Sequence, residues 1–131
     1  MTNTYGDVDR SADPRKAVEW QDYVDSWPQI KAYKRRVLEL FEGVEGVVDI
    51  GCGPGADVLA IGADRCIGID RSIVMCATAD SRGARTVQAD VRHLPFGNGV
   101  LGGVYADRVL QHVEDPMSAV EEMVRVLCPG G

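Results

Sequence analysis

The chain has 131 residues, of which 45% are hydrophobic and 26% charged, and these proportions exclude a disordered chain and predict a single globular domain. The formal net charge of −6 at pH 7 argues against an affinity based on neutralising phosphates, so nucleic acid is not expected as a partner. No apolar stretch is long enough to span a membrane and no segment has the pattern of a secretory signal, which favours a cytoplasmic protein.

The N-terminal third predicts two helices after a polar arm. Residues 1–13 are polar and are expected to be mobile. Residues 14–25 have apolar side chains at helical spacing, and Ser26-Trp27-Pro28 supplies a cap and a first-turn proline for a second helix that Gly43 ends. That second helix has an apolar and a solvent-facing side. The apolar stripe is Ile30, Tyr33, Val37, Leu38 and Phe41, and the solvent-facing side is Lys31, Lys34, Arg35 and Arg36.

A glycine-rich turn follows the first predicted strand, which runs from Val44 to Ile50. In such a turn between a strand and a helix, the missing side chains let a ligand approach the backbone, and the first N–H groups of the helix can bind it. The spacing Gly51-x-Gly53-x-x-Ala56 satisfies the loose dinucleotide fingerprint, so an NAD-dependent oxidoreductase is one alternative. Asp49 inside the strand and the stiff Pro54 disfavour it.

Two acidic residues follow the next two predicted strands. A short helix over 57–63 leads to a strand over 66–70, whose last residue is Asp70. Asp70 lies about twenty residues beyond the glycine turn, where a carboxylate can accept hydrogen bonds from ribose hydroxyls. The alternative is that Asp70 caps a helix over 72–79. Residues 86–88 form a third strand, after which Asp90 serves either a ligand or a turn.

The C-terminal third predicts one more strand and one more helix. Residues 100–106 form the fourth strand, whose beginning is weakened by Gly102 and Gly103. Asp115 caps the last helix and Pro116 occupies its first turn. The predicted buried stripe of that helix is Met117, Val120, Val124 and Leu127. The domain over 14–131 thus divides into N-terminal helices over 14–42 and an α/β core over 43–131.

The string Asp49-Ile50-Gly51-Cys52-Gly53-Pro54-Gly55 resembles the first motif of class I S-adenosylmethionine (SAM) dependent methyltransferases. The segment from Tyr105 to Pro116, with a hydrophobic-His-hydrophobic element ahead of an Asp-Pro helix start, resembles the ubiquinone/menaquinone biosynthesis (methyltransferase type 11) group. The resemblance covers residues 44–131. It implies a Rossmann-like α/β fold of three αβα layers, with parallel strands in the order 3-2-1-4 and a cofactor crevice between strands 1 and 4. The later strands of the family's usual seven are absent.

The resemblance also implies SAM as the cofactor and assigns residues to it. The implied cofactor-binding residues are Asp49, Gly51 and Gly53 at the methionine end, Cys52 in the same turn, Asp70 at the ribose, Arg71, Asp90 and Val91 near the adenine, and Asp107 at the methyl-transfer face. Arg71 departs from the family, which usually has an apolar residue there. His112 is the candidate general base, and the alternative is a structural histidine at a helix start.

The expected function is methyl transfer from SAM to a small-molecule acceptor. The alternative is a truncated SAM-binding fragment without catalysis, because the family's later strands are missing. The fourth strand would then be an exposed edge, so a homo-oligomer or a partner chain covering it is expected. The four dispersed cysteines, Cys52, Cys66, Cys76 and Cys128, are expected to be reduced packing residues, and no metal site is predicted, with a disulfide or metal site as the alternative.

Overall fold

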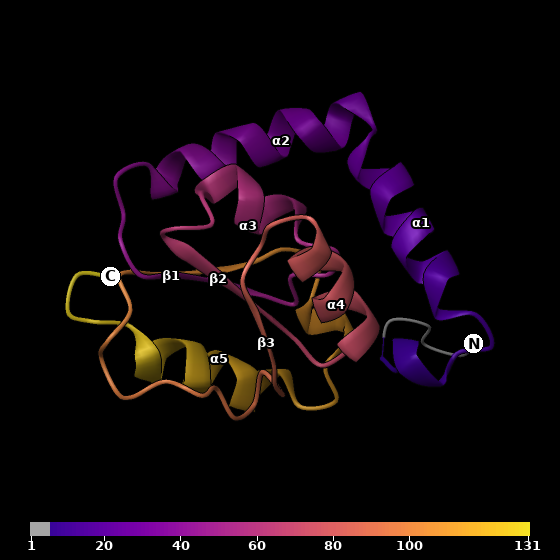
Figure 1. The fold of residues 1–131 in the computed structure, drawn as a ribbon. Helices are drawn as coiled ribbons and strands as arrows, with labels where there is room; N and C mark the ends of the chain where they lie inside the picture. Colours follow the sequence, from indigo (N-terminus) through magenta and orange to yellow (C-terminus); the bar gives the residue numbers. More distant parts are fainter. Residues whose placement is uncertain (1–5) are drawn as a thin grey trace.

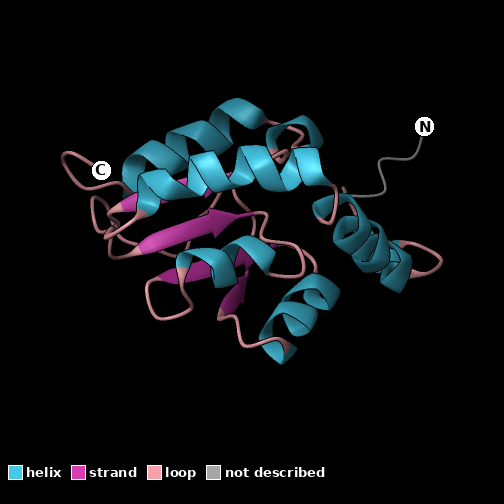
Figure 2. Ribbon diagram, turned by 90° about the horizontal axis from the view of Figure 1, so that it is seen from above, coloured by secondary structure: helices cyan, strands magenta, loops and turns pink. Residues whose placement is uncertain are grey.

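The computed structural model describes residues 6–131, which form a parallel four-stranded sheet with helices on both faces (Figures 1 and 2). The strands are β1 (Val47–Ile50), β2 (Cys66–Asp70), β3 (Thr86–Gln88) and β4 (Gly103–Ala106). Their spatial order is β3-β2-β1-β4, which confirms the predicted order. The chain therefore reverses its direction of strand addition between β1 and β4, where open α/β sheets bind ligands.

Strands β2 and β3 have the predicted bounds, whereas β1 and β4 begin later than predicted. Before β1, Gly46 has a φ of +67°, so the extended backbone starts only after it. Before β4, the backbone of Leu101 bonds to Val126 and Cys128 on the side away from β1. The regular ladder with β1 therefore starts at Gly103, which pairs with Val47.

Both faces of the sheet are apolar, as expected for a parallel sheet between helices. Helices α3 (Ala56–Ile61) and α4 (Ile73–Ser81) pack on one face, and α5 (Pro116–Val126) packs on the other, as Figure 1 shows. Neighbouring residues of a strand point to opposite faces, so Val47 and Val48 belong to different clusters. The three predicted layers are confirmed.

Two helices precede the sheet, α1 (Pro14–Asp25) with the predicted bounds and α2 (Pro28–Leu38), which continues as a 3-10 helix over Glu39–Phe41. The predicted cap of α2 is wrong. Trp27 occupies the cap position and makes no side-chain hydrogen bond, while the Ser26 hydroxyl donates to the Tyr23 carbonyl at 2.6 Å. Ser26 lies one residue too early to reach the first N–H groups of α2.

Residues 8–10 form a 3-10 helix, η1 (Val8–Arg10), and this differs from the mobile arm expected over 1–13. Val8 is 4% exposed and packs in a cluster with α1 and with Met75 of α4. Asp9 accepts hydrogen bonds from the first turn of α4. The part of the expectation that concerns residues 1–5 lies outside the described residues.

Helix α5 begins as predicted, with Pro116 in its first turn and Asp115 accepting a hydrogen bond from the Ser118 N–H at 3.2 Å. Its predicted buried stripe is wrong, because Met117 and Val124 are 65% and 64% exposed. The buried residues are Ala119 and Val126. Apolar residues occur on more than one side of the helix, and the side with Met123 and Val126 packs on the sheet.

Strand β4 forms one edge of the described sheet. On its open side, Leu127 makes a parallel bridge with Leu101, and the Cys128 N–H donates to the Leu101 carbonyl at 2.9 Å. Within residues 6–131, none of the helices combines the length and the apolar character that a bilayer crossing requires.

Candidate functional site

The chain turns sharply after β1 because glycine occupies a position that excludes side chains. Gly51 has a φ of +65°, and a Cβ there would lie 2.6 Å from Cγ2 of Val109. The turn rests on β2, since the Cys52 N–H donates to the Ile69 carbonyl at 3.0 Å. The Cys52 side chain fills the space above Gly68, where a Cβ would lie 2.6 Å from its Sγ. The position of the turn is therefore fixed against both neighbouring segments.

Asp70, at the end of β2, connects the glycine turn to the segment before α4. Its Oδ2 accepts a hydrogen bond from the Gly53 N–H and its Oδ1 accepts one from the Ser72 N–H, each at 2.9 Å. Burial raises the pKa of Asp70, and these two N–H groups oppose that rise. The cap of α4 is Ser72, whose Oγ accepts from the Met75 N–H at 3.1 Å. Asp70 thus fixes the approach to α4 without being its cap.

Asp90, after β3, forms a close ion pair with Arg92, which was not among the predicted site residues. Its Oδ1 accepts from the Arg92 backbone N–H at 2.9 Å, and its Oδ2 lies 2.7 Å from Nη2 of the guanidinium. Hydrogen bonding to Arg92 lowers the pKa of Asp90 to about 2, so the carboxylate is ionised at neutral pH. Arg92 occupies acceptor positions that an adenine amino group would use.

One cavity brings together every residue predicted for the site. It has a volume of about 310 Å³ and opens beside the glycine turn, at the carboxyl ends of the strands. The predicted residues that line it are Asp49, Gly51, Cys52, Gly53, Asp70, Arg71, Asp90, Val91, Asp107 and His112. His112 ends the 3-10 helix η3 (Leu110–His112), which follows β4.

Asp49 is a buried carboxyl group in the wall of this cavity. It is 3% exposed, and its side chain makes no hydrogen bond within residues 6–131. Burial, followed by repulsion from Asp57, raises the pKa of Asp49 well above its ordinary value, while the charge of Lys34 acts in the opposite direction. A cationic group in the cavity would stabilise the ionised form.

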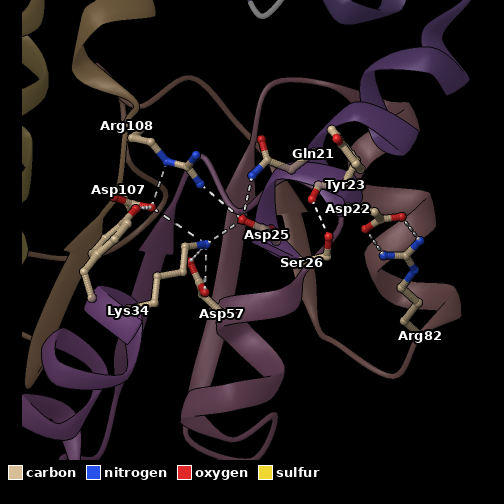
Figure 3. A network of polar contacts seen from close by, with 11 residues as sticks. Gln21, Asp22, Tyr23, Asp25, Ser26, Lys34, Asp57, Arg82, Asp107 and Arg108 are labelled. Atoms are coloured by element: carbon tan, nitrogen blue, oxygen red, sulfur yellow. Dashed lines mark hydrogen bonds and ion pairs between the residues drawn. The ribbon is translucent and has the colours of Figure 1, made fainter. Parts of the chain in front are cut away.

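A cluster of charged and polar side chains, here called the Lys34 group, surrounds Lys34 beside the cavity (Figure 3). Lys34 is predicted on the solvent-facing side of α2, but this is wrong, because the residue is only 8% exposed. Its Nζ lies 3.0 Å from Asp25, 3.0 Å from Asp57 and 3.7 Å from Asp107. Burial opposes its charge, but Asp57 and Asp25 outweigh burial and raise the pKa of Lys34. The lysine therefore stays cationic among three carboxylates.

The Lys34 group connects the N-terminal helices to the cavity. Arg108, in the loop after β4, binds Asp25 at the end of α1 and Asp107, each at 3.1 Å (Figure 3). The Tyr33 hydroxyl of α2 donates to Asp107 at 2.7 Å. Burial and the neighbouring Asp107 raise the pKa of Tyr33 to about 12, so this hydroxyl remains a donor. Asp107 is thus held from both α2 and its own loop.

The four cysteines are free, and Cys52, Cys66 and Cys76 are buried. Burial raises the pKa of the Cys66 thiol to about 12, as expected for a neutral packing residue. Among residues 6–131, no three His, Cys, Asp or Glu side chains are grouped so that they could hold a metal ion.

Comparison with known proteins finds a family model and related proteins. The model, described as a methyltransferase domain, matches residues 48–131. An uncharacterised 37.1 kDa protein in transposon Tn4556 of Streptomyces fradiae is 34% identical over 143 residues, covering 100% of this chain and 41% of that protein. Demethylmenaquinone methyltransferase of Mycolicibacterium paratuberculosis is 33% identical over 95 residues, covering 63% of this chain and 41% of that protein.

Two further similarities are to a probable tRNA methyltransferase and to a solved structure. A probable tRNA methyltransferase 9B of Bos taurus is 28% identical over 109 residues, which are 81% of this chain and 23% of that protein. The solved structure of a putative SAM-dependent methyltransferase from Methanococcus maripaludis has a TM-score of 0.75 and 23% identity, covering 89% of this chain and 60% of that one, and shows the same fold. The chain spans less than half the length of these curated relatives.

Proposed function

We propose that this chain, which belongs to the SAM-dependent methyltransferase family, binds SAM in the cavity beside the glycine turn and transfers its methyl group to a small-molecule acceptor. SAM is the cofactor that the family and the fold imply. The observation that carries the proposal is the convergence on one cavity of all the residues that the sequence assigns to the site.

The residues at the methionine end fit this cofactor. SAM carries a sulfonium and an ammonium group, both cationic. Asp49 presents a buried carboxyl group without a hydrogen bond, and a cation beside it would offset its cost of burial. The small residues of the glycine turn leave space for the methionine part of SAM, and the N–H groups of the turn can donate hydrogen bonds to it.

The residues at the ribose and adenine ends fit in different degrees. Each oxygen of Asp70 accepts one N–H group and keeps a lone pair for a ribose hydroxyl. The Val91 N–H, which makes no hydrogen bond within residues 6–131, is available to an adenine ring nitrogen. Asp90 would accept the adenine amino group only if Arg92 gave up one of its contacts.

The main contribution of the chain to methyl transfer is to orient SAM and the acceptor relative to each other. SAM, when bound, supplies an electrophilic methyl group for an in-line displacement. Holding two reactants in line can supply roughly 7 to 11 kcal/mol of the barrier. Asp107, fixed by Tyr33 and Arg108, gives the cavity a rigid wall on the β4 side. His112, on the same side, is proposed to accept the proton that the acceptor loses.

A small-molecule acceptor is the finer part of the proposal. The net charge of −6 and the carboxylates around the cavity weigh against a phosphate-rich acceptor, because like charges would repel it. One relative is named for a small molecule, demethylmenaquinone, and another for tRNA. The charge favours the first kind of acceptor for this chain.

The proposed function is tested by calorimetric titration with SAM and with NAD, followed by methyl-transfer assays on small molecules and on tRNA. SAM is expected to bind and NAD is not. Binding of NAD alone would contradict the proposal and support an oxidoreductase. Binding of SAM without transfer to any acceptor would support the second candidate, a non-catalytic SAM-binding fragment.

Replacing His112 by alanine is expected to lower kcat by roughly 100- to 10,000-fold, the usual effect of losing a general base. SAM affinity is expected to stay close to that of the wild type, since the assigned cofactor contacts remain. The matched control is His93→Ala, which changes an exposed histidine outside the cavity. Wild-type turnover in His112→Ala with an identified acceptor would end the assignment.

We also propose that another chain, either a second copy or a different partner, covers the open edge of β4. The edge exposes backbone groups, and α5, the next helix along the chain, exposes the apolar Met117 and Val124. We further propose that the protein resides in the cytoplasm. The four cysteines, which form no disulfide, support this location.

A further inference from the structure

Asp9 makes contacts far along the chain that the proposed cofactor roles do not explain. Its Oδ1 accepts the Ser72 hydroxyl at 2.5 Å and the Val74 N–H at 3.3 Å, and its Oδ2 accepts the Ile73 N–H at 2.8 Å. Three donors at the start of α4 thus depend on one carboxylate from η1. Burial opposes the charge, but these hydrogen bonds lower the pKa of Asp9, which keeps the carboxylate ionised.

Ser72 links Asp9 to Asp70. Ser72 is 3% exposed, its hydroxyl donates to Asp9, and its backbone N–H donates to Oδ1 of Asp70. The other oxygen of Asp70 accepts the Gly53 N–H of the glycine turn. A continuous chain of hydrogen bonds therefore runs from η1 through the start of α4 to the glycine turn.

Val8, the residue before Asp9, anchors η1 at the cavity. Val8 is 4% exposed, packs against Met75 of α4, and lines the cavity together with Met75. The segment that carries Asp9 is therefore part of the cavity wall beside Asp70.

We propose that Asp9 is a positioning residue for the cofactor's ribose, acting through Ser72 on the carboxylate of Asp70. This inference rests on the proposed function, because it requires a ribose at Asp70. Asp9 holds Ser72 and the first turn of α4, and the Ser72 N–H then fixes the orientation in which Asp70 presents its free lone pairs to the cavity. Without Asp9, Ser72 loses its hydroxyl acceptor and Asp70 loses a fixed orientation.

The test compares two ligands, SAM and a SAM analogue that lacks both ribose hydroxyls, by calorimetry. Asp9→Ala is expected to weaken SAM binding on the order of tenfold, as for the loss of one well-placed hydrogen bond to a charged group. The same substitution is expected to change binding of the analogue far less. The matched control is Asp7→Ala. Asp7 lies in the same segment, and its ion pair within residues 6–131 is with Arg10, at 3.5 Å, where the Arg10 side chain is 88% exposed.

Two outcomes would overturn the inference. One is wild-type SAM affinity in Asp9→Ala, and the other is an equal loss for both ligands, which would mean that Asp9 supports the fold without acting on the ribose. If Asp9→Ala unfolds, Asp9→Asn serves instead, because it keeps one acceptor oxygen and is expected to give a smaller loss, again specific to SAM. If the wild type itself does not bind SAM, the proposed function is refuted. This result differs from a failure of the Asp9 inference, in which the wild type binds SAM.

Discussion

Replacing Asp70 by alanine is expected to weaken SAM binding by about 1 to 3 kcal/mol, the penalty for leaving hydrogen-bonding partners of a charged group unsatisfied. Both oxygens of Asp70 already accept backbone N–H groups, from Gly53 and Ser72, so the substitution also removes the contact between the glycine turn and α4. Isothermal calorimetry with SAM measures the change.

Asp64→Ala is the matched control for this experiment. Asp64 is exposed and precedes β2, whereas Asp70 ends the same strand inside the cavity wall. Asp70→Asn is a second probe, because its amide would place an N–H donor opposite the N–H of Gly53 or Ser72. The Asp70→Asn variant is expected to bind SAM more weakly than the wild type, although asparagine and aspartate are similar in size. Unchanged SAM affinity in Asp70→Ala would refute the ribose assignment.

Replacing Lys34 by methionine is expected to destabilise the fold by about 3 to 5 kcal/mol, because it leaves buried carboxylates without their cation. Asp25 and Asp57 both lie 3.0 Å from Nζ, and their side chains are only 15% and 12% exposed. Urea denaturation followed by circular dichroism measures the free energy of unfolding.

The control for Lys34 lies on the same helix. Lys31→Met removes an exposed lysine one turn earlier and is expected to leave the free energy of unfolding nearly unchanged. Asp57→Asn in the Lys34→Met background should restore part of the loss, since it removes one uncompensated charge. The loss should also shrink as the pH falls through the pKa of Asp57, which burial already raises in the folded wild type. An equal loss in Lys31→Met and Lys34→Met would contradict the role of the buried network.

The strand order and the cavity residues could be predicted because the glycine turn and the segment after β4 resemble motifs of a family that has this strand order. Strands β2 and β3 have the predicted bounds, since each is a short run set off by polar or glycine-containing segments. Parallel strands bring their carboxyl ends to one edge, so residues as distant in sequence as Asp49, Asp70 and Asp90 had to converge.

The buried partners of the site could not be predicted, because they depend on tertiary contacts. Lys34 lies beside Arg35 and Arg36, a pattern typical of a solvated helix face. Its burial is explained by the carboxylates of Asp25, Asp57 and Asp107, which other segments bring to it. Asp9 likewise lies in a polar segment whose role appears only when α4 is placed beside it. A local signal did exist for Arg92, two residues after Asp90.

Cys52 and Gly68 share a space that holds one side chain and not two. A Cβ at Gly68 would lie 2.6 Å from the sulfur of Cys52 and 2.8 Å from its Cβ. Any enlargement at position 68 must therefore be compensated by a reduction at position 52, and displacement of Cys52 would lift the loop off β2. We expect natural variants of this chain to change the two positions together, and a designed alanine at 68 to be tolerated only beside a glycine at 52.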